Sequence, residues 1–202
     1  MARAIHNFAR TARTLQPLAL ARRFGLANGV TAARAVASLL LLGLSAEAAI
    51  GKLTLDPAMR WTAVAVAVAA LLSDGLDGWL ARRHGLASAF GARFDMESDA
   101  LLVLALALLV LAAGQAGAFV LLSGALRYLF VGAGRLAPAL RAPLPPSRRR
   151  QAICVAQVMC LIAALAPPVP AWAGEALAGL GLGLLLYSFG IDVLAMVARP
   201  RR

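Results

Sequence analysis

The chain has 202 residues, of which 61% are hydrophobic, with a mean hydropathy of +0.80 and a formal net charge of +11. So apolar a composition excludes an ordinary soluble domain and predicts one domain embedded in a membrane. The positive charge does not indicate a nucleic-acid partner, because the arginines gather in alternate connections between apolar segments, as in the cytoplasmic loops of membrane proteins.

Residues 1–27 form a basic segment ahead of the first apolar run. Ile5, Phe8 and Leu15 lie near one helical face, which predicts a short interfacial helix in the headgroup region, with a disordered basic tail as the alternative. The Leu-rich stretch at residues 35–48 resembles the apolar region and cleavage site of a signal peptide. The basic region before it is too long for that, and further apolar runs follow, so we expect an uncleaved first span.

Residues 28–202 contain six apolar segments, each long enough to cross a bilayer. They are approximately residues 30–50, 60–81, 92–113, 117–136, 151–172 and 175–197. The sequence therefore predicts an all-α integral membrane fold with six transmembrane helices. By the positive-inside rule, both termini of this multi-pass chain are cytoplasmic, in what we expect to be a bacterial cytoplasmic (inner) membrane. The connections expected outside are residues 51–59, 114–117 and 168–174.

Five of the nine acidic residues fall between Asp74 and Asp99. Asp74 and Asp77 are three residues apart at the end of the second span, and Asp95 and Asp99 are four apart at the start of the third. Each pair therefore shares one helix face. Since the connection between the two spans is short, we expect antiparallel neighbouring helices with all four carboxylates at the cytoplasmic end.

Four carboxylates at a membrane boundary require cations, because one Asp within a span costs about 2.5–3.5 kcal/mol on insertion scales. Clustered carboxylate oxygens are the ligands that Mg²⁺ or Mn²⁺ prefers. His84 lies in the connection and His6 is remote, so zinc is not expected. The alternatives are a solvated boundary face and a divalent-cation transporter. Transport would distribute acidic residues through the bilayer, whereas the third span is apolar from Leu101 through Ala113.

The same stretch resembles the signature of the CDP-alcohol phosphatidyltransferase family. The matching positions, at fixed spacing and without a gap, are Asp74, Asp77, Gly78, Ala81, Arg82, Gly91, Asp95 and Asp99. Asn28, Thr31 and Arg34 resemble the family's Asn, Thr and Arg at the start of the first span. Near the end of the chain, Tyr187-Ser188 and Gly190-Ile191-Asp192 resemble a run common in the phosphatidylglycerophosphate synthases of that family.

The resemblance implies transfer of a phosphatidyl group from a CDP-linked lipid, CDP-diacylglycerol, to a small alcohol with release of CMP, in phospholipid biosynthesis. It implies that Asp74, Asp77 and Asp95 are metal ligands, and that Asp99 completes the metal site and acts as the catalytic base. It also implies a homodimer among membrane lipids. The residues it assigns to the nucleotide of the donor are Thr31, Asp74, Gly78, Arg82 and Gly91.

The acceptor is left open by the sequence. Glycerol 3-phosphate is favoured, and inositol phosphate, serine or a further alcohol are the alternatives. Arg127, Arg149 and Arg150 are candidates for contact with an acceptor phosphate, because guanidinium groups suit bidentate phosphate binding. The positive-inside rule alone also accounts for these arginines.

Three residues of the last two spans complete the expectations. Asp192 lies within the sixth span, so it should pair with an arginine of the fourth span or of the basic loop before the fifth. Cys154 and Cys160 match no metal or redox spacing and are expected to be packing residues.

Overall fold

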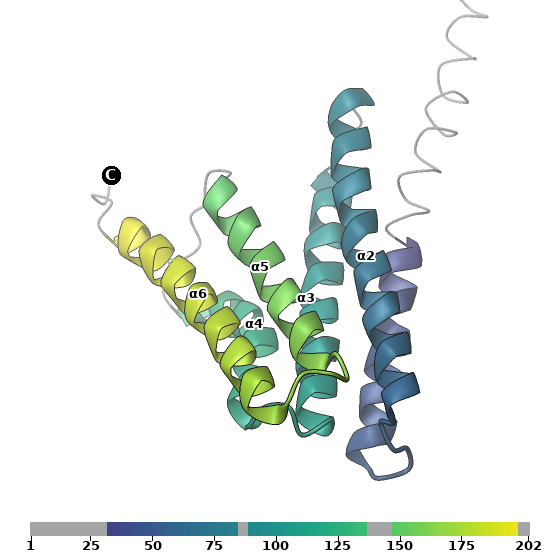
Figure 1. The fold of residues 1–202 in the computed structure, drawn as a ribbon. Coiled ribbons are helices and arrows are strands. Elements are labelled where there is room, and N and C mark those ends of the chain that lie inside the picture. The colour runs from purple at the N-terminus through teal and green to yellow at the C-terminus, as the bar shows by residue number, and fades with distance from the viewer. Residues whose placement is uncertain (1–31, 85–88, 137–146, 198–202) are drawn as a thin grey trace, which may run out of the picture.

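The computed structural model describes residues 32–84, 89–136 and 147–197, and these ranges contain helices and loops but no strand. Six long helices follow one another (Figure 1): Ala32–Ala49, here called the N-terminal helix, α2 Pro57–His84, α3 Ala89–Ala112, α4 Leu121–Leu136, α5 Arg148–Leu165 and α6 Ala171–Val197. A 3₁₀ turn, η1 Ala118–Val120, precedes α4. The all-α prediction is confirmed, whereas the predicted interfacial helix lies outside the described residues.

The helices match the six predicted apolar segments in order. Two of them, Ala32–Ala49 and the Ala171–Met196 part of α6, are long and apolar enough to cross a membrane, and Pro57–Ser73 is a shorter apolar stretch. The remaining crossings stay a prediction.

The fifth and sixth helices have different limits from those predicted. α5 ends at Leu165, not near residue 172, because Pro167 and the prolines that follow restrict the residues before them to extended conformations. α6 begins at Ala171, directly after Pro170. At the other end, residues 148–150 form the first turn of α5, although the sequence placed them in the loop. The basic group is therefore fixed on a helix.

The start of α2 is set by its first residues. A carboxylate oxygen of Asp56 accepts a hydrogen bond from the backbone N–H of Met59 at 2.7 Å. Pro57 follows at the first helical position, where its missing N–H costs nothing. The helix consequently begins three residues before the predicted limit.

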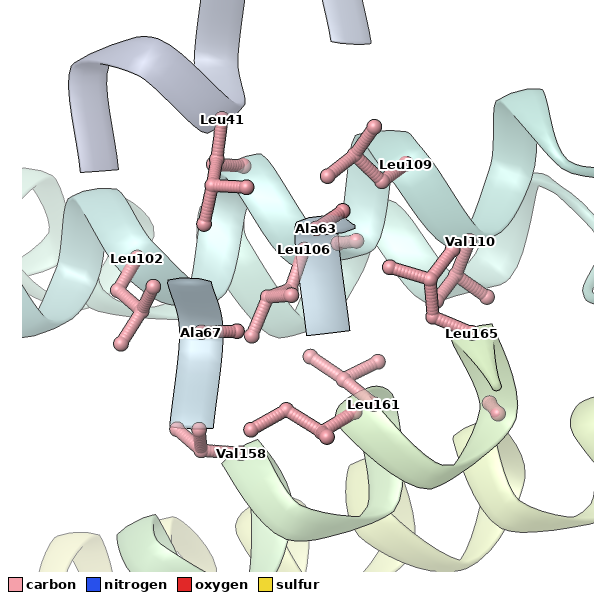
Figure 2. Packing of buried hydrophobic residues seen from close by; sticks show 14 of the residues in the cluster. Leu41, Ala63, Ala67, Leu102, Leu106, Leu109, Val110, Val158, Leu161 and Leu165 are labelled. Carbon is pink, nitrogen blue, oxygen red and sulfur yellow. The ribbon is translucent and has the colours of Figure 1, made fainter. Parts of the chain in front are cut away.

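The core is centred on α3. Its buried residues Leu102, Leu106 and Leu109 recur at helical spacing and belong to one cluster with Leu41 of the N-terminal helix. Figure 2 shows this cluster, to which α2 contributes Ala63 and Ala67 and α5 contributes Val158, Leu161 and Leu165. α3 also packs against α4, and α5 packs against α6. α3 thus packs against α4 and α5, α2 packs against α5, and the N-terminal helix contributes to the same core.

A polar network joins the helices at the end where α2 begins. Nε of Arg60 donates to the carbonyl of Leu165 at 2.9 Å, and its Nη2 donates to that of Ala166 at 3.2 Å. The carbonyl of Leu165 ends α5 and has no partner within the helix, and that of Ala166, the next residue, also accepts from the backbone N–H of Val169. The buried amide of Gln115, oriented with its nitrogen toward the carbonyl of Ala164, also accepts from Arg60 at 3.1 Å. The network fixes α2 to the end of α5.

Several helix ends lie at the opposite end of the bundle. In Figure 1 the C-terminal end of α2, the N-terminal ends of α3 and α5 and the C-terminal end of α6 all lie at the top. This alternation of direction is the one that a short α2–α3 connection predicts. The sequence places its acidic signature and its basic group at this same end.

Candidate functional site

The acidic signature lies on two helices that are separated in the chain only by residues 85–88. Asp74 and Asp77 are in the last three turns of α2, and Asp95 and Asp99 are in the first three turns of α3. The helical backbone keeps each pair on one face. Among these carboxylates only the side chain of Asp99 is described, so the convergence of all four stays a prediction.

The other predicted donor-binding residues have known backbone positions but no described side chains. Gly78 and Arg82 are in α2, and Gly91 is in α3. Thr31 lies outside the described residues, directly before the N-terminal helix. Arg127 is in α4, where its side chain is also outside the description.

Asp99 lies against a buried arginine that comes from another helix. Nη1 of Arg34 is 3.7 Å from Oδ1 of Asp99. The side chain of Arg34 is 1% exposed and that of Asp99 is 48% exposed. The sequence marks Arg34 only by its resemblance to a family position, since nothing in the pattern tells which helix it faces. The carboxylate of Asp99 therefore has a cation on its inner side and remains accessible on its outer side.

A second charged cluster forms between α5 and α6. The carboxylate of Asp192, in a residue only 8% exposed, accepts from Nη2 of Arg149 at 2.5 Å and lies 3.5 Å from Nη1 of Arg150. The expected arginine partner for Asp192 is thus confirmed. Nη1 of Arg149 is also buried, and it has no hydrogen-bond partner among the described residues. This atom can donate to a ligand.

Cys154 of α5 lies near a charged residue of each cluster. Its thiol interacts electrostatically with both Asp99 and Arg150. The residue is exposed in the chain by itself, and its expected packing role stays a prediction. Sequence reasoning missed Cys154 because its place near both clusters depends on how α5 packs against α3. The carboxylate of Asp99 and the arginines at the start of α5 consequently belong to one neighbourhood.

The donor set fits a hard divalent cation. All four motif side chains are carboxylates, which suit Mg²⁺ or Mn²⁺ by charge and by oxygen chemistry. About half of the Asp99 side chain is exposed, so its carboxylate can be reached by an ion. Among the side chains that the structure describes, no three candidate ligands form a group. The fit therefore rests on the chemistry of the four residues.

Comparison with known proteins gives one family. A family model described as CDP-alcohol phosphatidyltransferase matches residues 24–189. The match includes the acidic signature, Arg34 and both Arg149 and Arg150, and it ends before Asp192. Comparisons with curated proteins and with solved structures gave no match.

Proposed function

Because the chain belongs to the CDP-alcohol phosphatidyltransferase family, we propose that it transfers the phosphatidyl group of CDP-diacylglycerol to glycerol 3-phosphate and releases CMP. Members of this family are membrane-associated transferases of phospholipid biosynthesis that move a substituted phosphate group from a CDP-alcohol to an acceptor alcohol. Membership supports this enzyme class over a divalent-cation transporter. The particular donor and acceptor are the proposal.

Asp74, Asp77, Asp95 and Asp99 are proposed to hold one or two divalent ions, Mg²⁺ or Mn²⁺. When bound, such ions neutralise the pyrophosphate of the donor and align the attacking and leaving oxygens. The family generally uses divalent metals, and a set of four carboxylates supports the same use here. The carboxylates would hold the cations at the end of the bundle where α2 ends and α3 begins.

Asp99 is also proposed to be the base. The acceptor hydroxyl gives its proton to the carboxylate while its oxygen forms a bond to the phosphatidyl phosphorus. The bond from that phosphorus to the oxygen of CMP breaks, and CMP leaves. The accessible outer side of Asp99 supports this role, since a base must come within hydrogen-bond reach of the hydroxyl.

The nucleotide of the donor is proposed to lie against α2 and α3. Gly78 and Gly91 lack side chains that would fill the space beside the signature, and Arg82 supplies a cation for phosphate. Thr31 is proposed to contact the nucleotide from the start of the N-terminal helix. These assignments follow the family signature.

The preference for a phosphorylated acceptor rests on the arginines of α5. Asp192 fixes the guanidinium of Arg149, whose Nη1 remains able to donate. Arg150 contacts the other oxygen of the same carboxylate. The charges of Arg150 and Asp99 both act on the thiol of Cys154. The buried Nη1 of Arg149, which has no hydrogen-bond partner among the described residues, favours a further anion. Glycerol 3-phosphate supplies it as a phosphate, as does an inositol phosphate, whereas serine offers only a carboxylate accompanied by its own ammonium group, and uncharged alcohols offer no anion. Arg127 is kept as a third candidate.

We further propose six membrane spans with both termini in the cytoplasm of a bacterial cell, and a homodimer. The two long apolar helices and the family support membrane association. The loop charges support the orientation.

The test is release of CMP by the purified chain supplied with CDP-diacylglycerol. We expect release with glycerol 3-phosphate in Mg²⁺ or Mn²⁺, much less with serine or glycerol, and none after EDTA. Inositol phosphate is the matched comparison, because it shares the phosphate and differs in the alcohol. Equal release with unphosphorylated alcohols would exclude the proposed role of the arginines, and release without a divalent ion would exclude the metal site.

A further inference from the structure

Arg34 is among the most deeply buried charged side chains in the described part of the chain. Only 2% of the residue is exposed, and its guanidinium lies beside Asp99 of α3. Resting on the proposed function, we infer that Arg34 is a positioning residue: it holds the carboxylate of Asp99 from the protein side, so that the base faces the acceptor hydroxyl.

The register between two helices places this pair. One stripe of the N-terminal helix faces the bundle, and all its residues are at most 2% exposed: Arg34, Ser38, Leu41 and Ser45. Leu41 belongs to the same cluster as Leu106 of α3 (Figure 2). Both Leu41 and Leu106 come seven residues after their partner in the ion pair, a rise of about 10 Å on each helix. The apolar packing therefore fixes where the guanidinium meets the carboxylate.

The exposures of the two side chains show from which side Arg34 acts. It approaches from the interior, where screening by salt is weak, while about half of the Asp99 side chain is open. The N–O distance of 3.7 Å exceeds the hydrogen-bond range of about 2.7–3.2 Å. The attraction is therefore that of an ion pair. It orients the carboxylate and leaves its accessible side for substrate.

The inference separates orientation from metal retention. Arg34 stays protonated and exchanges no proton in the reaction. Without it, the Asp99 carboxylate keeps its charge but loses the cation that orients it from the protein side. A misplacement of about 1 Å in a reacting group can cost up to about a hundredfold in rate. Loss of Arg34 should therefore reduce turnover more than the binding of metal or donor.

The experiment compares Arg34→Gln and Arg34→Lys with the parent chain. It measures kcat and KM for CMP release with CDP-diacylglycerol and glycerol 3-phosphate, Mn²⁺ affinity of the metal-stripped protein by electron paramagnetic resonance, and the melting temperature. For Arg34→Gln we expect kcat to fall about 10- to 100-fold. KM for the CDP-lipid and the Mn²⁺ affinity should stay within about twofold, since the metal ligands are untouched. Arg34→Lys keeps the charge in a different shape, so its kcat should lie between the other two.

The matched control is Arg60→Gln, the same chemical change at the opposite end of the bundle. It should lower the melting temperature by removing hydrogen bonds to the end of α5, while kcat stays unchanged. The inference is overturned if Arg34→Gln keeps the parent kcat, if kcat, Mn²⁺ affinity and melting temperature fall together, or if Arg34→Lys is no better than Arg34→Gln. Should Arg34→Gln fail to insert, a parent-like kcat in Arg34→Lys overturns it.

Different results would exclude the proposed function and the role of Arg34. A parent chain that releases no CMP removes the proposed function, and the role of Arg34 falls with it. An active parent chain with an equally active Arg34→Gln variant removes only the role of Arg34.

Discussion

Asp99 has two proposed roles, as a metal ligand and as the base that accepts a proton. The substitution Asp99→Asn separates these roles. Asp99→Asn keeps the size and one oxygen ligand but removes the basicity. General-base catalysis typically supplies about 10²–10⁴ in rate. We therefore expect CMP release to fall at least about a hundredfold while binding of CDP-lipid in Mg²⁺ is retained, as measured by single-turnover and ligand-binding assays.

Asp74→Asn is the contrasting change on α2. It weakens a proposed ligand of the ions that contact the pyrophosphate, so binding of the donor should fall together with turnover. Near-normal turnover of Asp99→Asn at saturating metal would assign the proton to water or to another group.

Arg149 permits an equally direct test of the acceptor site. Its Nη1 is the buried donor without a described partner, so Arg149→Gln should raise KM for glycerol 3-phosphate at least about tenfold, the cost of about 1.4 kcal/mol in one charged hydrogen bond. KM for the CDP-lipid should not change. The neighbouring Arg148 is exposed, and Arg148→Gln is the control. If both substitutions raised KM equally, Arg149 would contribute only positive charge and would not donate a specific hydrogen bond to the acceptor phosphate.

For single residues, the sequence predicts a contact where the free-energy cost of leaving that residue unpaired is large wherever the helices pack. The pairing of Asp192 with an arginine was predictable because a lone carboxylate within a span is expensive. The pairing of Arg34 with Asp99 was not, since it depends on which face of the N-terminal helix packs against α3. The position of Cys154 near Asp99 and Arg150 was not predictable for the same reason, since it depends on packing between helices.

Among the elements, the contact between α2 and α5 depends on Arg60. The two hydrogen bonds to carbonyls at the end of α5 come from one guanidinium, and each hydrogen bond to a charged group is worth about 1.5–3 kcal/mol. Arg60→Gln should lower the melting temperature measured by fluorescence in detergent. If Arg60→Lys kept the melting temperature of the parent chain, a positive charge alone would stabilise this contact, and the two hydrogen bonds of the guanidinium would not be required.

The approach of α4 to α3 depends on Gly124. A Cβ there would lie 2.8 Å from the Cα of Leu104, closer than such atoms come in real structures. Small residues of this kind let membrane helices pack closely. We expect Gly124→Ala to lower the melting temperature because the two backbones must separate. Gly132 is on the same helix with no described atom within 4 Å of its would-be Cβ, so Gly132→Ala should be tolerated. Equal melting temperatures for the two variants would contradict this packing.

The limits of the helices show how far pattern alone reaches. Apolar runs found the six helices, because each is a long hydrophobic stretch between breaks. The same runs missed the end of α5, since residues 166–172 are apolar and only the prolines among them stop the helix. The start of α5 was also predicted wrongly, because the arginines at 148–150 suggested a loop and these residues are helical.

For the whole molecule, the orientation in the membrane is the prediction that organises all others. The charges of the loops place residue 54 outside and residue 145 inside. After replacement of Cys154 and Cys160 by serine, Thr54→Cys and Pro145→Cys should react with a membrane-impermeant maleimide from opposite sides of sealed vesicles. Reaction of both from the same side would be incompatible with six spans.

Cys154 also gives the molecule an intrinsic reporter of occupancy. A thiol reacts with alkylating reagents at a rate set by its burial and by the charges around it, and the charges near Cys154 belong to the proposed base, Asp99, and to Arg150, one of the proposed acceptor-binding arginines. We expect bound CDP-lipid or glycerol 3-phosphate to slow its alkylation, while the less exposed Cys160 reacts independently of both ligands. The unaltered chain thus carries a probe that registers each substrate without catalysis.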